Sequence, residues 1–252
     1  MSKLVFIDAD NTLWDTNAVY RDAQLWLLGA VEQRVGATAD SADRLAFVRT
    51  VDQEIAAQHH GGLRYPAQIL ARALALVLNG DPVVRAVKRV WTDERAGLAP
   101  DEAQVLEDGF KAHLNVTPEL RPGVSSGVAR LSAAGFTLFV LTEGQRDRIE
   151  RTLAAHGLDR AGVRILEAKK EGALYQRVSR LEGADTAFMI GDQLDRDIAP
   201  AKAAGLTTIY FPGGFAPRWT PREAEAGPDF KVASLDEAAD LVLAAEAPAA
   251  AQ

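Results

Sequence analysis

Residues 4–12, Leu-Val-Phe-Ile-Asp-Ala-Asp-Asn-Thr, decide the fold, because a short apolar segment runs directly into polar turn residues. Four consecutive apolar residues are typical of a strand that is buried on both faces, as in a parallel sheet. Two aspartates, Asp8 and Asp10, follow at its carboxyl end. Helical periodicity begins near Thr16, so we expect one strand, a turn and then a helix.

A purely helical segment is expected over residues 17–116, because its apolar residues recur at the three- and four-residue spacing of an amphipathic helix. Proline and glycine residues divide this segment into parts. Helices are expected over about 16–36, 41–59, 66–78, 82–92 and 101–113. In the fourth of these, Val84, Val87 and Trp91 are predicted to face the interior.

From residue 117 onward, short apolar segments alternate with helical ones. Strands are expected at 136–141, 163–166, 187–190, 207–211 and 230–232. Repeated strand–helix units with apolar strands indicate a parallel sheet that helices cover on both faces. The first strand belongs to the same sheet. We therefore predict one α/β domain, residues 1–16 and 117–252, with the helical domain 17–116 inserted into it.

The composition restricts the classes of protein to consider. The 252 residues are 48% hydrophobic and 25% charged, as in ordinary globular proteins. Cysteine is absent, which excludes disulfides, thiolate metal sites and cysteine nucleophiles. The net charge of −7 argues against a nucleic-acid partner. Because no segment resembles a membrane span or a signal peptide, we expect a soluble cytoplasmic protein with no membrane partner. The oligomeric state is not indicated.

Polar side chains follow four of the expected strands, at the edge where an open parallel sheet binds its ligands. They are Asp8 and Asp10 after the first strand, Thr142 after 136–141, Lys169 and Lys170 after 163–166, and Asp192, Asp195 and Asp197 after 187–190. Carboxylates that lie together raise one another's pKa and are costly to bury, so positive charge must lie among them.

One lysine supplies a single positive charge, and a hard divalent cation with oxygen ligands, in the first place Mg²⁺, fits the remainder. A zinc site is not expected, because the chain has no cysteine and no histidine near these strand ends. Carboxylates that bind Mg²⁺ beside a lysine and a hydroxyl are suited to receive a phosphoryl group.

Four segments carry a resemblance to a known family. They are Asp8-Ala-Asp-Asn-Thr-Leu-Trp14, Leu141-Thr-Glu-Gly144, a lysine ahead of the helix with Tyr175, and Gly191-Asp-Gln-Leu-Asp-Arg-Asp197. In this order they resemble the four motifs of the haloacid dehalogenase-like (HAD) hydrolase superfamily. The resemblance implies a Rossmann-like parallel sheet, with residues 17–116 as a helical cap between the first and second motifs.

The resemblance also implies catalytic and metal-binding roles. Asp8 is expected to be the nucleophile that forms an aspartyl-phosphate. Asp10 is expected to protonate the leaving alcohol and then to activate the water that hydrolyses the intermediate. The implied metal ligands are Asp8, Asp192 and, through its backbone carbonyl, Asp10. Asp197 would orient the lysine or a metal-bound water.

Substrate binding is assigned by the same resemblance to Thr142, Glu143 and Lys170. Thr142 is expected to hydrogen-bond the phosphoryl group, and Lys170 to offset its charge. Glu143 stands where the family often has asparagine, which would alter the contacts beside the phosphate. The third motif lacks its common proline, so Lys169 stays the alternative lysine. Lys170 is preferred because it stands five residues before Tyr175, a spacing that some members use.

Together these residues predict a Mg²⁺-dependent phosphatase that acts on a small phosphorylated metabolite. Asp10 favours ester hydrolysis, because an alkoxide leaving group needs a proton and a halide does not. A haloacid dehalogenase and a phosphomutase are the enzymatic alternatives on the same fold. A phosphate-binding regulatory module is the non-enzymatic alternative. The sequence does not identify the substrate.

Overall fold

Strand β1 (Ser2–Asp8) is the central element of the sheet. The computed structural model describes residues 2–60 and 62–245. Residues 4–7 of β1 are all fully buried, as expected for a strand that is covered on both faces. Its two neighbours, β2 (Thr137–Thr142) and β4 (Ala184–Gly191), both run parallel to it.

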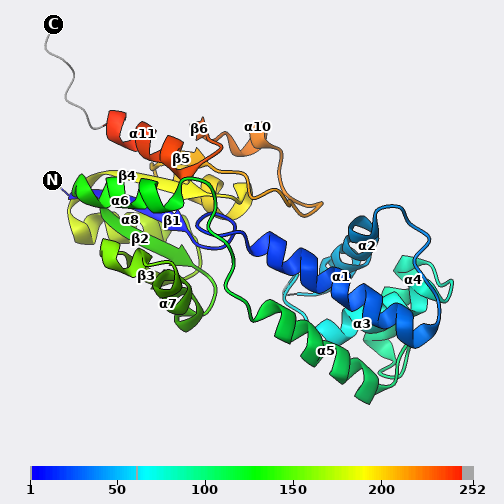
Figure 1. Cartoon of the computed structure of the whole chain (residues 1–252). Coiled ribbons are helices and arrows are strands. Elements are labelled where there is room, and N and C mark those ends of the chain that lie inside the picture. Colours follow the sequence, from blue (N-terminus) through cyan, green and yellow to red (C-terminus); the bar gives the residue numbers. More distant parts are fainter. Residues whose placement is uncertain (1, 61, 246–252) are drawn as a thin grey trace, which may run out of the picture. The chain divides into compact units, whose positions relative to one another are not determined.

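In the described part of the chain, six strands form one parallel sheet in the order β3-β2-β1-β4-β5-β6 (Figure 1). The outer strands are β3 (Arg164–Glu167), β5 (Thr207–Tyr210) and β6 (Phe230–Lys231). The expected parallel α/β sheet is thereby confirmed. The chain places β2 and β3 on one side of β1 and then crosses to the other side for β4. Such a reversal leaves a crevice beyond the carboxyl ends of the strands.

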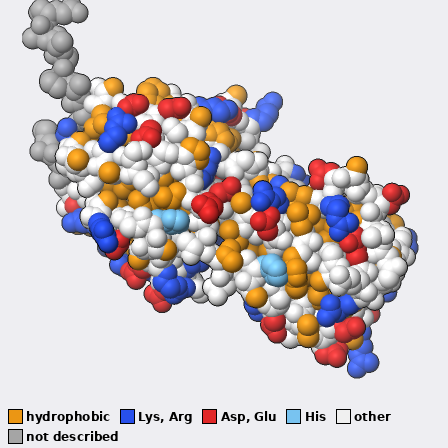
Figure 2. Space-filling model, viewed as in Figure 1, with side chains coloured by type: hydrophobic (Ala, Val, Ile, Leu, Met, Phe, Trp, Pro, Cys, Tyr) orange, Lys and Arg blue, Asp and Glu red, His pale blue; other side chains and the backbone are white. Residues whose placement is uncertain are grey.

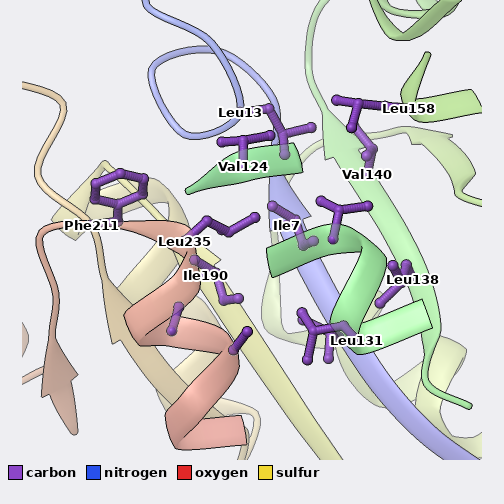
Figure 3. Packing of buried hydrophobic residues seen from close by; sticks show 14 of the residues in the cluster. Ile7, Leu13, Val124, Leu131, Leu138, Val140, Leu158, Ile190, Phe211 and Leu235 are labelled. Atoms are coloured by element: carbon purple, nitrogen blue, oxygen red, sulfur yellow. The ribbon is translucent and has the colours of Figure 1, made fainter. Parts of the chain in front are cut away.

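Helices cover both faces of this sheet. On one face lie α6 (Val124–Ala133), α7 (Arg146–Ala155) and α11 (Leu235–Ala245), and on the other α8 (Gly172–Glu182) and α9 (Ala199–Ala203). Ile7, Leu131 and Leu235 meet in the first layer (Figure 3). Leu4 and Phe6 pack with Tyr175 in the second layer. The alternation of β1 side chains thus joins both layers to one strand.

Three short elements complete this part of the chain. They are a 3₁₀ turn, η1 (Leu158–Ala161), a π-helical turn, η2 (Leu194–Ile198), and α10 (Glu223–Ala226). The π-helical turn begins shortly after the end of β4 and carries Asp197. A π-turn re-aims the side chains within a helix and is frequent at functional sites.

Contacts divide the chain into two compact units, Met1–Asn17 with Thr117–Gln252 (the sheet unit), and Ala18–Val116 (the helical unit). The helices from α1 to α5 are α1 (Thr16–Val35), α2 (Arg44–Gln58), α3 (Ala67–Leu78), α4 (Val83–Thr92) and α5 (Pro100–Leu114). Leu27, Val51 and Leu74 belong to an apolar core that the helical unit forms by itself.

The buried face of α4 differs from the predicted one. Val87 is buried as expected, but Val84 is 52% exposed and Trp91 is 37% exposed. Ala86 and Val90 face the interior together with Val87. The prediction for Val84 and Trp91 was wrong because α4 has apolar residues at adjacent positions, Val83 with Val84 and Val90 with Trp91, so that two neighbouring stripes both look apolar.

Surface charge and helix composition bear on where in the cell the protein could reside. On the face that Figure 2 shows, acidic and basic side chains are interspersed. Among residues 2–60 and 62–245, the structure has no helix that combines the length and the apolar character needed to cross a membrane. The cytoplasmic location stays a prediction.

Candidate active site

The carboxyl ends of three adjacent strands bring Asp8, Thr142 and Asp192 to one edge of the sheet. Asp8 is the last residue of β1, Thr142 is the last residue of β2, and Asp192 directly follows β4. The strand register pairs Asp8 with Leu141 and Ile7 with Ile190, so the strands end at about the same level. All three polar side chains are buried, so the charge states of the two aspartates depend on their immediate contacts.

Lys170, in the loop between β3 and α8, is the cation that contacts this edge. Its Nζ donates to Oδ1 of Asp8 and, at 2.6 Å, to Oδ1 of Asp197. Its side chain is 6% exposed, and these carboxyl contacts hold its pKa well above the usual value despite the burial. Lys169 points elsewhere: it pairs with Glu171 and is 79% exposed. The geometry therefore places Lys170, and not Lys169, at the strand ends.

Asp8, Asp192 and Asp197 form a buried cluster in which one carboxylate oxygen of each lies within 4.8 Å of the others. Burial raises the pKa of Asp8 to about 7 and that of Asp192 well above its usual value. Both oxygens of Asp197 accept hydrogen bonds, from Lys170 and, at 2.9 Å, from the Gln193 backbone N–H.

Two oxygens of this cluster differ from the rest. Within the described part of the chain, Oδ2 of Asp8 and Oδ1 of Asp192 are buried and accept no hydrogen bond. A buried carboxylate oxygen without a donor is costly, and a cation is a common partner for it. These hard oxygen donors suit Mg²⁺ or a similar divalent ion. The residues present thus fit a metal at Asp8 and Asp192.

Asp10 lies apart from that cluster, in the turn after β1. Its carboxylate accepts hydrogen bonds from Trp14 Nε1 at 3.0 Å and Thr16 Oγ1 at 2.8 Å. Both terminal nitrogens of Arg148 donate to it as well. Burial alone would raise the pKa of Asp10, but the contact with Arg148, aided by Trp14 and Thr16, lowers it below the usual value. The carboxyl is therefore ionised in this arrangement.

The turn itself is held by Arg121. Asn11 adopts a left-handed conformation with φ 63°, which asparagine tolerates better than most residues. The Arg121 guanidinium donates to the carbonyls of Asn11, Phe211 and Pro212 and stacks over the Phe211 ring at 3.6 Å. These contacts join the turn that carries Asp10 to the loop after β5.

A comparison with protein families assigns the chain to one of them. The model of the haloacid dehalogenase-like hydrolase family matches residues 2–205, well over half of the chain, and this range includes all the strand ends described above. The chain belongs to this family. It is therefore an enzyme of the hydrolase class.

Two curated relatives of this HAD hydrolase carry phosphatase names. Phosphoserine phosphatase of Thermus thermophilus is 28% identical over 152 residues, which are 57% of this chain and 59% of that protein. Glyceraldehyde 3-phosphate phosphatase of Methanopyrus kandleri is 23% identical over 250 residues, which are 96% of this chain and 97% of that protein. The match thus spans less than two thirds of the first relative and nearly all of the second.

Among solved structures, YfnB of Bacillus subtilis, solved bound to magnesium, matches this HAD hydrolase with a TM-score of 0.62. The two chains are 18% identical, and the match covers 96% of this chain and 99% of that one. At this level of identity the similarity concerns the fold.

Glu143 connects three loops of the HAD site. Its Oε1 accepts a hydrogen bond from the Lys170 backbone N–H at 3.2 Å, and Oε2 pairs with Arg196. Arg196 lies in η2, next to Asp197. Thr142, the preceding residue, accepts the Gly144 N–H on its Oγ1 at 2.9 Å. The carboxylate of Glu143 therefore ties the ends of β2 and β3 to the turn after β4.

Removal of the Glu143 carboxylate is expected to impair turnover more than substrate affinity. In Glu143→Ala, the Lys170 loop and η2 lose a common anchor, and small displacements of reacting groups cost about 10- to 100-fold in rate. We expect kcat to fall by about that factor while KM changes less. Steady-state kinetics would check this, with Glu171→Ala, which breaks the exposed pair with Lys169, as the control. A change confined to KM would instead indicate direct substrate contact by Glu143.

Sequence reasoning missed Arg148 and Arg121. Arg148 contacts Asp10 across 138 positions of sequence, and Arg121 contacts Asn11 across 110. Neither arginine occupies a position of the four motifs. For Arg148, the sequence offers only its place in the first turn of the helix after Thr142, and an arginine there is ordinarily predicted to be a solvated side chain.

Proposed function

We propose that this HAD hydrolase is a Mg²⁺-dependent phosphatase that hydrolyses a small phosphorylated metabolite through an aspartyl-phosphate on Asp8. The observation that carries the proposal is the environment of the Asp8 carboxylate. One of its oxygens is bound by Lys170 and the other, buried beside Asp192, has no hydrogen-bond donor among the described residues. Phosphatase names among the relatives support this reaction over others.

Asp8, Asp192 and the backbone carbonyl of Asp10 would hold the metal. Mg²⁺ bound there supplies positive charge that lowers the pKa of both buried carboxyls and offsets the charge of the phosphoryl oxygens. Asp197 would act through Lys170, because both of its own oxygens already accept hydrogen bonds. Lys170 and Thr142 would bind the phosphoryl group and orient it toward Asp8.

The reaction has two steps on this chain. A carboxylate oxygen of Asp8 attacks phosphorus and forms a P–O bond, while the bond from phosphorus to the oxygen of the leaving alcohol breaks. Asp10, which has first taken up a proton from the solvent, donates that proton to the leaving oxygen. Asp10 then accepts a proton from a water molecule as its oxygen attacks phosphorus, which releases inorganic phosphate and restores Asp8. The ionised Asp10 carboxylate held by Arg148 is the state needed for the second step.

The helical unit would serve as a cap that selects the substrate and excludes water during the first step. A haloacid dehalogenase is the main alternative reaction. A carboxylate at Asp10, held by Trp14 and Thr16 in a defined position, supports ester cleavage instead, because a halide leaves without a proton. Halide release from haloacids and isomerisation of sugar phosphates are the assays that separate the dehalogenase and phosphomutase reactions from hydrolysis.

Phosphate release from a panel of phosphorylated metabolites tests the proposal directly. We expect hydrolysis of at least one monoester in the presence of Mg²⁺, and a fall of about 100-fold or more after chelation with EDTA, because the buried carboxyls then lose their counter-charge. Adding Mg²⁺ back should restore the activity. Phosphate release that is equally fast with and without EDTA would contradict the metal assignment, and phosphate-analogue binding without turnover of any monoester would support a regulatory module.

A further inference from the structure

Arg148 is a charged residue at this site to which the sequence motifs assign no role. It lies in the first turn of α7, directly after the short loop that follows Thr142. Its Nη1 donates to Oδ1 of Asp10 at 3.0 Å, and its Nη2 donates to Oδ2. The side chain of Arg148 is 38% exposed, so close packing does not immobilise it, whereas Asp10 is also held by Trp14 and Thr16. Rotation about side-chain bonds can therefore bring the guanidinium to another anion.

The surroundings of Gly144 show that the Arg148 guanidinium and the Thr142 hydroxyl lie close enough to bind the same anion. A Cβ atom at residue 144 would be 3.1 Å from Nη2 of Arg148, 3.2 Å from Oγ1 of Thr142 and 3.9 Å from Oδ2 of Asp10. A guanidinium, a hydroxyl and a carboxylate thus border one point at which the chain has no side chain of its own. That point lies one bond length from the Gly144 Cα, and a Cβ atom there would come closer to Nη2 and Oγ1 than side chains usually do. Glycine therefore allows the Arg148 guanidinium and the Thr142 hydroxyl to converge on this side of residue 144.

We propose that Arg148 binds the phosphoryl group of the substrate together with Thr142, and that it turns part of its guanidinium fork from Asp10 to the phosphoryl oxygens. The inference rests on the proposed function, in which Thr142 holds the same group. A guanidinium donates two parallel N–H bonds to phosphate as readily as to carboxylate. The phosphoryl group also carries more negative charge than the single charge of Asp10, so it attracts the cation more strongly.

The distribution of charge supports the same conclusion. Lys170 is already bound to Asp8 and Asp197 at the strand ends. An incoming phosphoryl group would add negative charge next to these buried carboxyls. A second cation beside Thr142 reduces that repulsion, and Arg148 is within reach of this position because its Nη2 and the Thr142 hydroxyl both approach the same side of Gly144.

Binding of inorganic phosphate tests the inference without turnover, because phosphate is the product of the proposed reaction. Calorimetric titrations in Mg²⁺ would compare Asp10→Asn with the double variant Asp10→Asn/Arg148→Gln. Asp10→Asn removes the carboxylate that Arg148 neutralises. Any further loss of phosphate affinity in the double variant therefore reports contact between Arg148 and phosphate. We expect the double variant to bind phosphate about 10- to 100-fold more weakly, the range for a charge-assisted hydrogen bond. The phosphate affinity of Asp10→Asn/Arg148→Lys should lie between the affinities of these two variants.

Arg146→Gln in the Asp10→Asn background is the matched control. It removes the same charge from the same turn of α7 and breaks only exposed contacts, with Glu150 and the Ile165 carbonyl. Its phosphate affinity should stay within about twofold of the parent. Equal affinity with and without Arg148, or no phosphate binding in Asp10→Asn, would overturn the inference. A wild-type protein that binds phosphate through Arg148 but hydrolyses no monoester would overturn the proposed function and leave the inference standing.

Discussion

Asp8→Asn is expected to lower kcat for phosphate release by about 10⁴-fold or more, because a neutral amide cannot replace the carboxylate that attacks phosphorus. The fold should survive. Asparagine has nearly the same shape, and the substitution removes a buried carboxyl whose pKa burial already raises to about 7. Single-turnover assays at enzyme excess, with a circular-dichroism melt of the variant, would measure both effects.

The control for this variant is Asp195→Asn, which removes the same charge from an exposed position of η2. Its kcat should stay within about twofold of the wild type. A second readout is the covalent intermediate itself. In Asp10→Asn, where activation of water is impaired, the protein is acid-quenched after reaction with an aryl phosphate, whose phenolate leaving group depends less on a proton donor. This protein should carry a phosphoryl group on the peptide that contains Asp8. Asp8→Asn that keeps a tenth of the wild-type rate would rule out the aspartyl-phosphate mechanism.

Lys170→Met should impair both stability and activity. The Nζ of Lys170 contacts Asp8 and Asp197, and all three side chains are buried. Removing one partner of a buried ion pair leaves uncompensated charge and costs about 3–5 kcal/mol of the free energy of unfolding. Urea denaturation in EDTA would measure this loss, and kcat should fall by about 10³-fold because the phosphoryl group also loses its cation.

The loss of stability should depend on pH in a defined direction. Burial raises the pKa of Asp8 to about 7 even beside Lys170, and without the lysine it rises further. The folded variant then binds more protons than the unfolded chain, so its stability falls as the pH rises above about 4. The difference from wild type should therefore be small near pH 4 and largest near pH 8. A deficit that is independent of pH would contradict this electrostatic origin.

Lys169→Met separates the two candidate lysines. Because Lys169 is exposed and contacts Glu171, its replacement should change the free energy of unfolding by less than about 0.5 kcal/mol and leave kcat unchanged. If this variant, and not Lys170→Met, lost activity, the assignment of the third motif to Lys170 would be wrong.

The sequence was sufficient to predict the parallel sheet and its helices, because this information is local. The apolar segment 4–7 can only be buried on both faces, and the alternation of strands with helices after residue 117 requires parallel pairing. The carboxyl ends of parallel strands meet at one edge, so the order of strands and helices along the chain is enough to expect Asp8, Thr142 and Asp192 together. The stripe of α4 was placed wrongly because apolar residues stand at adjacent positions in this short helix, so that the sequence offers two neighbouring apolar stripes.

Only the tertiary structure decided which side chains contact one another at that edge. It selected Lys170 over Lys169, tied Glu143 to Arg196, and placed Arg148 on Asp10. Spacing along the chain could not predict the last of these contacts, because it joins residues 138 positions apart. A single arginine also forms no periodic pattern from which the partner of its long side chain could be predicted. Local pattern determines which strand ends meet, whereas the partners of each charge depend on loops that only the folded chain brings together.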